Sequence, residues 1–313
     1  MSKTNNKLPL VSVIIPTYCR PKYFEIALKS VLNQTYQNIE IFITDNSPDD
    51  KTKILMRKYL DKYTNIIYEH HPEYSEMDNW ECAMAYNNPK AEYVNWLMDD
   101  DIFLPNKIAY MVDKFIQYEN LALVTSYRQC IDEKGKILPD YNTTIPIADT
   151  DTIYTGLIAG RDILINMRNY IGEPTTVMIK KSCMKNGTLG ARVSNDKYWV
   201  SDFPTWLQCL EHGDLYYSST PLSQFRIHSG QVQLDNCFYG KVLCKWAIEY
   251  LYEYQRPQFI KHRCELDLAI DRWFDELDYY IDNTIKNKYL DCEIINALIE
   301  FSEKLITCKR NQL

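Results

Sequence analysis

The sequence lacks several features, and each absence excludes a class of protein. No stretch approaches the roughly 20 consecutive apolar residues that a membrane-spanning helix needs. Residues 1–7 are polar, so we expect no secretory signal sequence. There is no polybasic block, and the net charge of −7 argues against a nucleic-acid-binding protein. We therefore expect a cytoplasmic protein, with peripheral attachment to the inner face of the membrane as the alternative.

The ten cysteines form neither a metal-binding nor a disulfide pattern. No two of them are spaced as CxxC, and their intervals are irregular. We expect reduced, mostly buried thiols, because a secreted disulfide scaffold of 313 residues without a signal sequence is unusual. With 46% hydrophobic and 25% charged residues, the composition is that of an ordinary globular protein, large enough for one large domain or two unequal ones.

Strand-like and helix-like segments alternate through the first half of the chain. Apolar runs at residues 10–15, 39–44 and 65–68 predict strands of a buried parallel sheet. The intervening segments predict helices, one over residues 21–34 and one from an N-cap at Ser47 to about residue 62. This β-α-β-α-β order implies right-handed crossovers, and ligands of such sheets lie at the carboxyl ends of the strands.

The rest of the chain continues this pattern and then becomes helical. We predict helices over residues 79–87, 105–118, 160–168 and 203–210, strands at 93–98, 121–126, 174–179, 214–218 and 221–227, a hairpin turn at 132–136 and a long loop over 139–155. After residue 240 the pattern predicts two or three helices. We therefore expect an α/β domain over residues 1–235 and a helical extension over residues 236–313.

Three consecutive carboxylates, Asp99, Asp100 and Asp101, follow the predicted strand at residues 93–98. We call them the acidic triplet. Two unit charges about 4 Å apart interact by about 1 kcal/mol in water and about 4 kcal/mol at an effective dielectric near 20. A divalent cation would neutralise them well, because hard cations bind oxygen ligands. The alternative is a solvated acidic turn that caps the next helix, which Pro105 is placed to open.

Polar side chains converge on the edge of the sheet where this triplet lies. Arg20 and Asp45 also come directly after predicted strands. Because the carboxyl ends of parallel strands meet at one edge, we expect these side chains and the triplet to form one ligand site.

Several of these segments resemble the family 2 glycosyltransferases. Residues 11–18 are similar to the family's opening strand, residues 30–36 to its S-V-L-x-Q-T-Y segment and residues 225–228 to its late R-x-H. The acidic triplet matches its DxD motif. The resemblance covers roughly residues 9–235. It implies the GT-A fold: an α/β, Rossmann-like, mostly parallel sheet flanked by helices, here with an appended C-terminal helical segment.

The resemblance also implies an activity and a set of site residues. The activity is metal-dependent, inverting, non-processive transfer of a hexose from a nucleotide sugar to an acceptor hydroxyl. The implied nucleotide-sugar-binding residues are Pro16, Thr17, Tyr18, Arg20, Asp45, Asn79, Asp99 and Asp100. The implied ligands of Mn²⁺ or Mg²⁺ are Asp99, Asp101 and His228, and the implied general base is Asp202. Glu173 is a further candidate for contact with the donor sugar or the acceptor.

The chemistry of these side chains is compatible with their roles, but structural alternatives stay open. Tyr18 can pack on a base or ribose, or simply pack at the strand end. Asp45 can contact the base or cap a helix. Asp202, ionised at neutral pH, can take a proton from the acceptor or favour a helix N-terminus. Arg20 can pair with a phosphate, and His228 can bind a metal, contact the diphosphate or be structural.

Departures from the family pattern narrow the interpretation. Ser201 stands where the family usually has Glu, and residues 69–88 lack its common glycines. The Q-x-x-R-W motif of processive synthases is absent. A nucleotidyltransferase is not expected, because residues 16–21 contain no glycine. A catalytically silent binding or assembly partner is the remaining alternative, and retention of the implied site residues speaks against it.

Donor, acceptor and partners are expected from family frequency alone. UDP is the expected carrier, with GlcNAc, Glc or Gal as the sugar. The acceptor would be a surface glycan, a lipid-linked intermediate or a protein. The aromatic cluster at residues 246–252 packs on the core by default; a homodimer face and contact with a membrane-bound acceptor are the alternatives.

Overall fold

The described strands form one mixed sheet. The computed structural model describes residues 8–141, 144–184, 202–229, 236–287 and 291–310. The strands are β1 (Leu10–Thr17), β2 (Ile39–Asp45), β3 (Ile66–His70), β4 (Ala91–Trp96), β5 (Ile102–Phe103), β6 (Leu121–Ile131), β7 (Thr152–Tyr154), β8 (Met178–Lys180) and β9 (Asp214–Arg226). Their order is β3-β2-β1-β4-β8-β6-β9-β5, with β7 paired to β9. The first four are parallel, whereas β8 is antiparallel to both of its neighbours.

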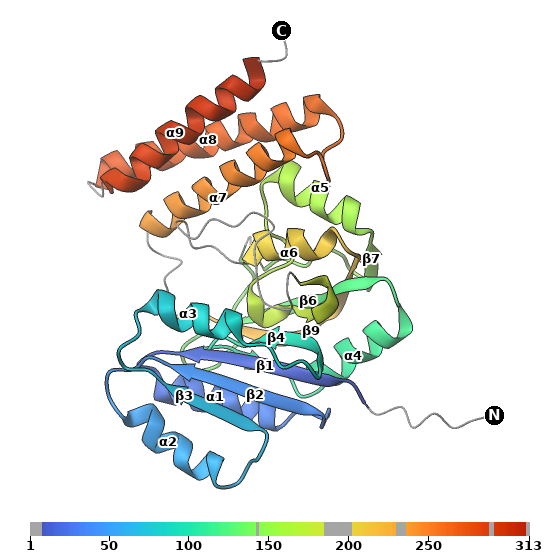
Figure 1. Cartoon of the computed structure of the whole chain (residues 1–313), viewed down its shortest axis with the longest axis vertical. Helices are drawn as coiled ribbons and strands as arrows, with labels where there is room; N and C mark the ends of the chain where they lie inside the picture. The colour runs from blue at the N-terminus through green and yellow to red at the C-terminus, as the bar shows by residue number, and fades with distance from the viewer. Residues whose placement is uncertain (1–7, 142–143, 185–201, 230–235, 288–290, 311–313) are drawn as a thin grey trace, which may run out of the picture.

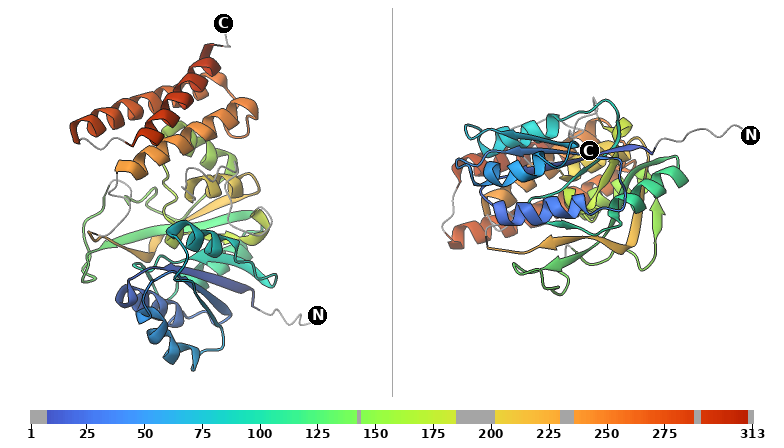
Figure 2. Two further views of the ribbon diagram at one scale, coloured as in Figure 1. Left: turned by 60° about the vertical axis from the view of Figure 1, so that its left-hand side comes forward. Right: turned by 90° about the horizontal axis from the view of Figure 1, so that it is seen from below.

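Helices cover both faces of this sheet (Figures 1 and 2). They are α1 (Pro21–Leu32), α2 (Lys51–Leu60), α3 (Glu76–Ala85), α4 (Lys107–Gln117), α5 (Gly156–Asn166), α6 (Asp202–Leu210), α7 (Asn236–Gln255), α8 (Arg263–Asn287) and α9 (Cys292–Arg310), with 3₁₀ turns η1 (Pro174–Thr176) and η2 (Lys181–Cys183). Among the described residues, no helix has the length and apolar character needed to span a membrane.

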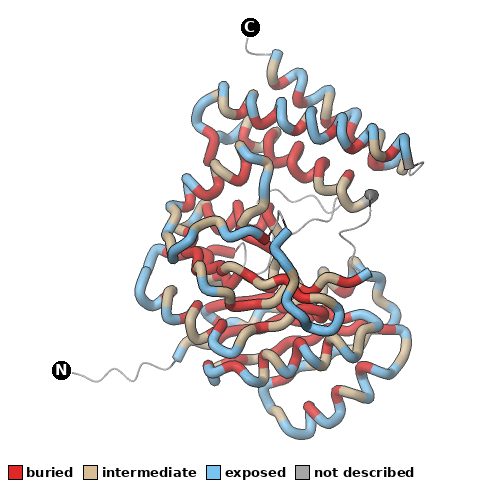
Figure 3. Tube along the Cα trace, turned by 180° about the vertical axis from the view of Figure 1, so that it is seen from behind, coloured by how far each residue is buried: buried red, intermediate tan, exposed pale blue. Residues whose placement is uncertain are grey.

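Two hydrophobic clusters hold these layers together, because successive strand residues point to opposite faces. Val13 and Ile41 belong to the cluster beneath α1, α2 and α4. Ile14 and Phe42 belong to the other cluster, which α3, α5, α6 and the C-terminal helices cover. Figure 3 shows buried residues along the strands and exposed ones along the outer sides of the helices. The predicted α/β fold with an appended helical segment is confirmed.

The C-terminal helices pack on the core of the α/β part. The Trp246 ring stacks on Phe203 of α6 with a centroid distance of 4.1 Å. The Tyr250 hydroxyl donates a hydrogen bond of 2.9 Å to the Leu164 carbonyl oxygen of α5. The aromatic cluster at residues 246–252 therefore contributes to a shared core, while the boundary at residue 235 stays a prediction.

Several predicted boundaries of helices and strands were wrong. The helix after β2 begins at Lys51, because the Ser47 hydroxyl accepts a hydrogen bond from the Cys19 backbone N–H at 2.8 Å and caps no helix. Helix α4 begins at Lys107 after an N-cap at Asn106, so Pro105 lies before the helix and does not open it. Pro174, which has no N–H for a ladder, begins a 3₁₀ turn instead of a strand. The two strands expected over 214–227 are one continuous strand, β9.

Candidate active site

The carboxyl ends of three parallel strands meet at one edge of the sheet. Thr17 at the end of β1 pairs with Asp45 at the end of β2, and Ile14 pairs with Trp96 at the end of β4. The acidic triplet follows β4 directly. All three carboxylates are buried.

Asp99 is bound to the end of β1. Its Oδ2 accepts hydrogen bonds from the Thr17 hydroxyl at 2.8 Å and from the Tyr18 N–H at 3.3 Å. Its Oδ1 lies 3.3 Å from the Arg20 guanidinium. Burial and the neighbouring Asp100 raise the pKa of Asp99 to about 6, against the opposing effect of Arg20. Burial and the charge of Asp100 therefore outweigh the stabilisation that Arg20 gives to the ionised Asp99.

Asp100 faces a different pair of side chains. Its Oδ2 lies 3.2 Å from Arg20 Nη1 and 2.8 Å from His228 Nε2. The imidazole of His228 packs near the Tyr23 ring, with a centroid distance of 5.4 Å. A carboxylate oxygen and an imidazole nitrogen thus converge from β4 and from the end of β9.

Asp101 points into the protein. Its Oδ2 accepts a hydrogen bond of 2.6 Å from the Thr175 hydroxyl, and its Oδ1 accepts one of 3.0 Å from the Arg226 N–H. Burial, together with Asp100 and Glu173, raises the pKa of Asp101 well above its usual range. Both oxygens thus accept hydrogen bonds from protein donors, and the predicted role of Asp101 in metal binding stays a prediction.

Arg226 fixes the backbone of the triplet. Its Nε donates to the Asp100 carbonyl oxygen at 2.8 Å, and its Nη1 donates to the Asp132 carbonyl oxygen at 3.0 Å. The arginine of the predicted R-x-H segment therefore connects the triplet to the turn at residues 132–136, which the backbone bond from Asp132 N–H to the Lys136 oxygen closes.

The remaining predicted nucleotide-binding residues surround the ends of β1 and β2. Tyr18 is 54% exposed, so its ring is accessible to a ligand. Asp45 is fully buried and accepts hydrogen bonds from the Tyr68 hydroxyl at 2.6 Å and the Ser47 N–H at 2.8 Å. Asn79 of α3 accepts a bond of 2.6 Å from the Thr44 hydroxyl. Pro16 lies buried within β1.

Asp202 is the first residue of α6, and Ser201 lies outside the described residues. Burial raises the pKa of Asp202 to about 6, while hydrogen bonds from the Phe203 N–H and from Asn169 oppose that rise. The Asn169 Nδ2 donates to Asp202 Oδ2 at 2.8 Å. The carboxylate is thus held in one orientation and is largely ionised at neutral pH.

The comparison with protein-family models shows which family this chain belongs to. The family model for glycosyl transferase family 2 matches residues 12–183, more than half of the chain, including most of β1, all of β4 and the triplet. The chain belongs to glycosyl transferase family 2. The predicted family and the predicted enzyme class are confirmed.

Relatives and solved structures agree with this family. An uncharacterized glycosyltransferase of Rickettsia typhi is 30% identical over 240 residues, which are 73% of this chain and 67% of that protein. The GalNAc(5)-diNAcBac-PP-undecaprenol beta-1,3-glucosyltransferase of Campylobacter jejuni is 24% identical over 210 residues, 67% of this chain and 62% of that protein. The crystal structure of S. aureus TarS 1–349 in complex with UDP-GlcNAc has a TM-score of 0.66 at 17% identity, covering 93% of this chain and 80% of that one. This last likeness shows the GT-A fold.

In this family 2 member, sequence reasoning missed the residues that support the site. Thr175 and Asn169 hold two of the carboxylates, yet neither lies in a motif. The buried Lys107 donates a bond of 2.9 Å to the Thr176 carbonyl oxygen. Glu173, a predicted substrate contact, pairs with Arg128 at 2.7 Å, and both side chains are largely buried. The residues in each of these contacts are distant in sequence, so no local sequence pattern predicts the contacts.

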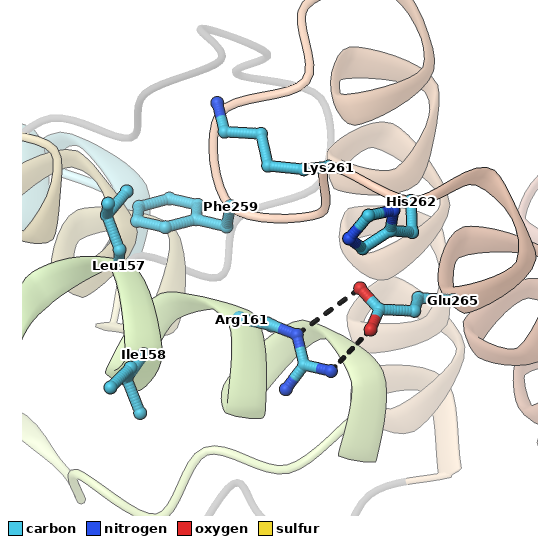
Figure 4. A pocket seen from close by; sticks show the side chains of 7 residues that line it. All are labelled: Leu157, Ile158, Arg161, Phe259, Lys261, His262 and Glu265. Atoms are coloured by element: carbon cyan, nitrogen blue, oxygen red, sulfur yellow. Dashed lines mark hydrogen bonds and ion pairs between the residues drawn. The ribbon is translucent and has the colours of Figure 1, made fainter.

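A separate hollow lies between α5 and the start of α8 (Figure 4). It is lined by Leu157, Ile158, Arg161, Phe259, Lys261, His262 and Glu265. Arg161 pairs with Glu265 across it. Its lining residues are distinct from the acidic triplet and from Asp202, and we assign the hollow no part in transfer.

Proposed function

We propose that this family 2 glycosyltransferase is a metal-dependent, inverting enzyme that transfers a hexose from a UDP-sugar to an acceptor hydroxyl. The observation that carries the proposal is the convergence of Asp100 and His228, 2.8 Å apart, beside Arg20 at the carboxyl end of β4. Ligands of α/β sheets bind at such an edge.

The residues at this edge fit Mn²⁺ or Mg²⁺. Carboxylate oxygens suit hard divalent cations, and an added imidazole nitrogen favours Mn²⁺ over Mg²⁺. We assign Asp100 and His228 as direct ligands, in place of the expected Asp99 and Asp101. Asp99 would face the donor beside the Thr17 hydroxyl and the Tyr18 N–H. When bound, the metal would offset negative charge on the diphosphate leaving group.

The donor would bind across the ends of β1 and β2. The accessible Tyr18 ring would pack on the uracil or the ribose, and Arg20 would pair with a phosphate oxygen. Asp45 and Asn79 would line the base side of the pocket. The UDP-GlcNAc complex of S. aureus TarS supports a UDP-sugar. The hexose would be GlcNAc, Glc or Gal, as expected from family frequency.

Asp202 would act as the general base. Its carboxylate would accept the proton of the acceptor hydroxyl as that oxygen attacks the anomeric carbon, and UDP would leave from the opposite face. One displacement of this kind inverts the configuration at that carbon. The name of the C. jejuni relative favours a lipid-linked glycan as acceptor over a free glycan or a protein.

Nucleotide release from UDP-, GDP- and dTDP-sugars, each with Mn²⁺, Mg²⁺ or EDTA, tests the proposal. We expect metal-dependent UDP release that falls by about 100-fold or more in Asp100→Asn and in His228→Asn. Asp113→Asn, an exposed aspartate of α4, is the matched control and should keep wild-type release. Absence of both turnover and metal-dependent donor binding would refute the proposal and support a silent binding partner.

A further inference from the structure

Three side chains of different chemistry meet at the carboxyl end of β3, outside the site described above. Glu69 lies in β3, and His71 directly follows the strand. Cys82 reaches them from α3. The carboxylate oxygen, the imidazole nitrogen and the thiol sulfur all lie within 4.8 Å of one another. We call these residues the Glu69–His71–Cys82 cluster.

We propose that this cluster binds a zinc-type divalent cation. A tetrahedral Zn²⁺ lies about 2.0 Å from nitrogen and oxygen and about 2.3 Å from sulfur, which separates these ligand atoms by about 3.3–3.5 Å. Glu69 Oε2 lies 3.3 Å from His71 Nε2 and 3.7 Å from Cys82 Sγ. The cluster therefore matches two edges of the tetrahedron without a large movement of the backbone.

The histidine is already oriented for coordination through Nε2. Its Nδ1 lies 3.4 Å from Glu73 Oε1, and a carboxylate at the second ring nitrogen is the usual partner of a metal-bound histidine. The ring stacks on Tyr74 with a centroid distance of 4.2 Å. The His71 backbone N–H donates to the Asp45 carbonyl oxygen at 2.8 Å, which fixes the segment to the end of β2.

The ligand set selects the class of metal. Thiolate and imidazole favour Zn²⁺, Co²⁺ or Cu over Mg²⁺ and Ca²⁺, which prefer oxygen ligands. The Glu69 side chain is 44% exposed, so solvent can supply the fourth ligand. The cluster is therefore distinct in chemistry from the acidic triplet, and its occupancy does not depend on the proposed transfer reaction.

Metal binding here would fix α3 against the sheet. Asn79, one turn before Cys82, bonds the Thr44 hydroxyl at 2.6 Å and reaches the Thr17 carbonyl oxygen at 3.5 Å. The ion would therefore tie β3 to the helix that packs beneath the end of β1.

Co²⁺ titration of the metal-stripped full chain tests this site. We expect Co²⁺ at the cluster to give a thiolate-to-cobalt charge-transfer band in the near ultraviolet, which Zn²⁺ then abolishes by displacing Co²⁺. Co²⁺ at the proposed Asp100–His228 site has no thiolate ligand and gives no such band. The band should vanish in Cys82→Ser and His71→Asn, and Zn²⁺ affinity should fall by about 100-fold. Cys264→Ser, an exposed cysteine of α8, is the matched control and should keep both. No band in the wild type, or a band that survives in Cys82→Ser, would overturn the proposal.

A second measurement needs no variant, so it decides the matter if a substitution prevents folding. Alkylation of the wild-type thiols is followed by mass spectrometry with and without Zn²⁺. Zn²⁺ should slow the modification of Cys82 by about tenfold or more and leave exposed Cys264 unaffected. Equal rates at Cys82 in both conditions would mean that the cluster is only hydrogen-bonded.

Discussion

The contact between Asn169 and Asp202 makes the pH dependence of transfer a direct test of the proposed base. Asp202 has a pKa of about 6, because burial outweighs its hydrogen bonds. The base must be ionised, so kcat/KM should rise with pH and reach half of its plateau near pH 6. Asp202→Asn should lower the plateau by about 10²–10⁴-fold.

Replacing the amide should move this midpoint. The Asn169 Nδ2 donates to Asp202 Oδ2 at 2.8 Å and favours the ionised form. A hydrogen bond to a charged group contributes about 1.5–3 kcal/mol, and one pKa unit corresponds to about 1.4 kcal/mol. Asn169→Ala should therefore raise the midpoint by about 1–2 units. Activity would fall several-fold at pH 7 and recover above pH 8.

The profile must be separated from titration of the triplet, because the pKa of Asp99 is also about 6. Asn169 contacts Asp202 and Gly172, so its replacement should move only a midpoint that belongs to Asp202. Asn166→Ala, an exposed asparagine at the end of α5, is the matched control. An unchanged midpoint in Asn169→Ala, measured by initial rates between pH 5 and pH 9, would refute Asp202 as the base.

Three further predictions concern stability and use thermal or urea unfolding. Thr175→Val should destabilise the protein by about 2–4 kcal/mol, because a buried oxygen of Asp101 loses its donor, whereas Thr175→Ser should stay near wild type. Trp246→Ala should cost about 3–5 kcal/mol by removing the ring stacked on Phe203, and a cost below 1 kcal/mol would contradict a shared core. In metal-free protein, the free energy of unfolding should fall by about 2–3 kcal/mol between pH 4 and pH 7, relative to the Asp99→Asn variant. The reason is that the raised pKa of folded Asp99 contributes stability below about pH 4, which is lost as the pH rises through about 6. A difference between the two proteins that does not change with pH would contradict the raised pKa.

Sequence patterns predicted the parts of the fold that depend on local burial. Strands β1, β2 and β4 are rich in apolar residues and buried along most of their length, as strands of a sheet covered on both faces are. Boundaries were less predictable where a side chain serves a distant partner. The Ser47 hydroxyl is used by Cys19 and not by a helix end, and this depends on how β1 and β2 pair.

The position of the candidate site was predictable from the sequence, but the partners of its individual carboxylates were not. Strand order alone brings Arg20, Asp45 and the triplet to one edge. Which carboxylate faces which partner depends on Thr175 and Arg226, which are 74 and 125 residues away from Asp101. Side-chain orientation in a turn of three identical residues follows from such partners, and a motif match cannot distinguish the members.

The three carboxylates of the triplet are chemically identical but differ in what surrounds them. Asp99 is held by the end of β1, and Asp101 is held by Thr175 and the backbone of β9. These two contacts fix the turn on both sides and leave Asp100 between Arg20 and His228. A single ion-binding carboxylate on a flexible turn would lose rotamer entropy on each binding event. Anchoring its neighbours removes part of that cost in advance, which is a physical reason for an acid on each side of the proposed metal-binding Asp100.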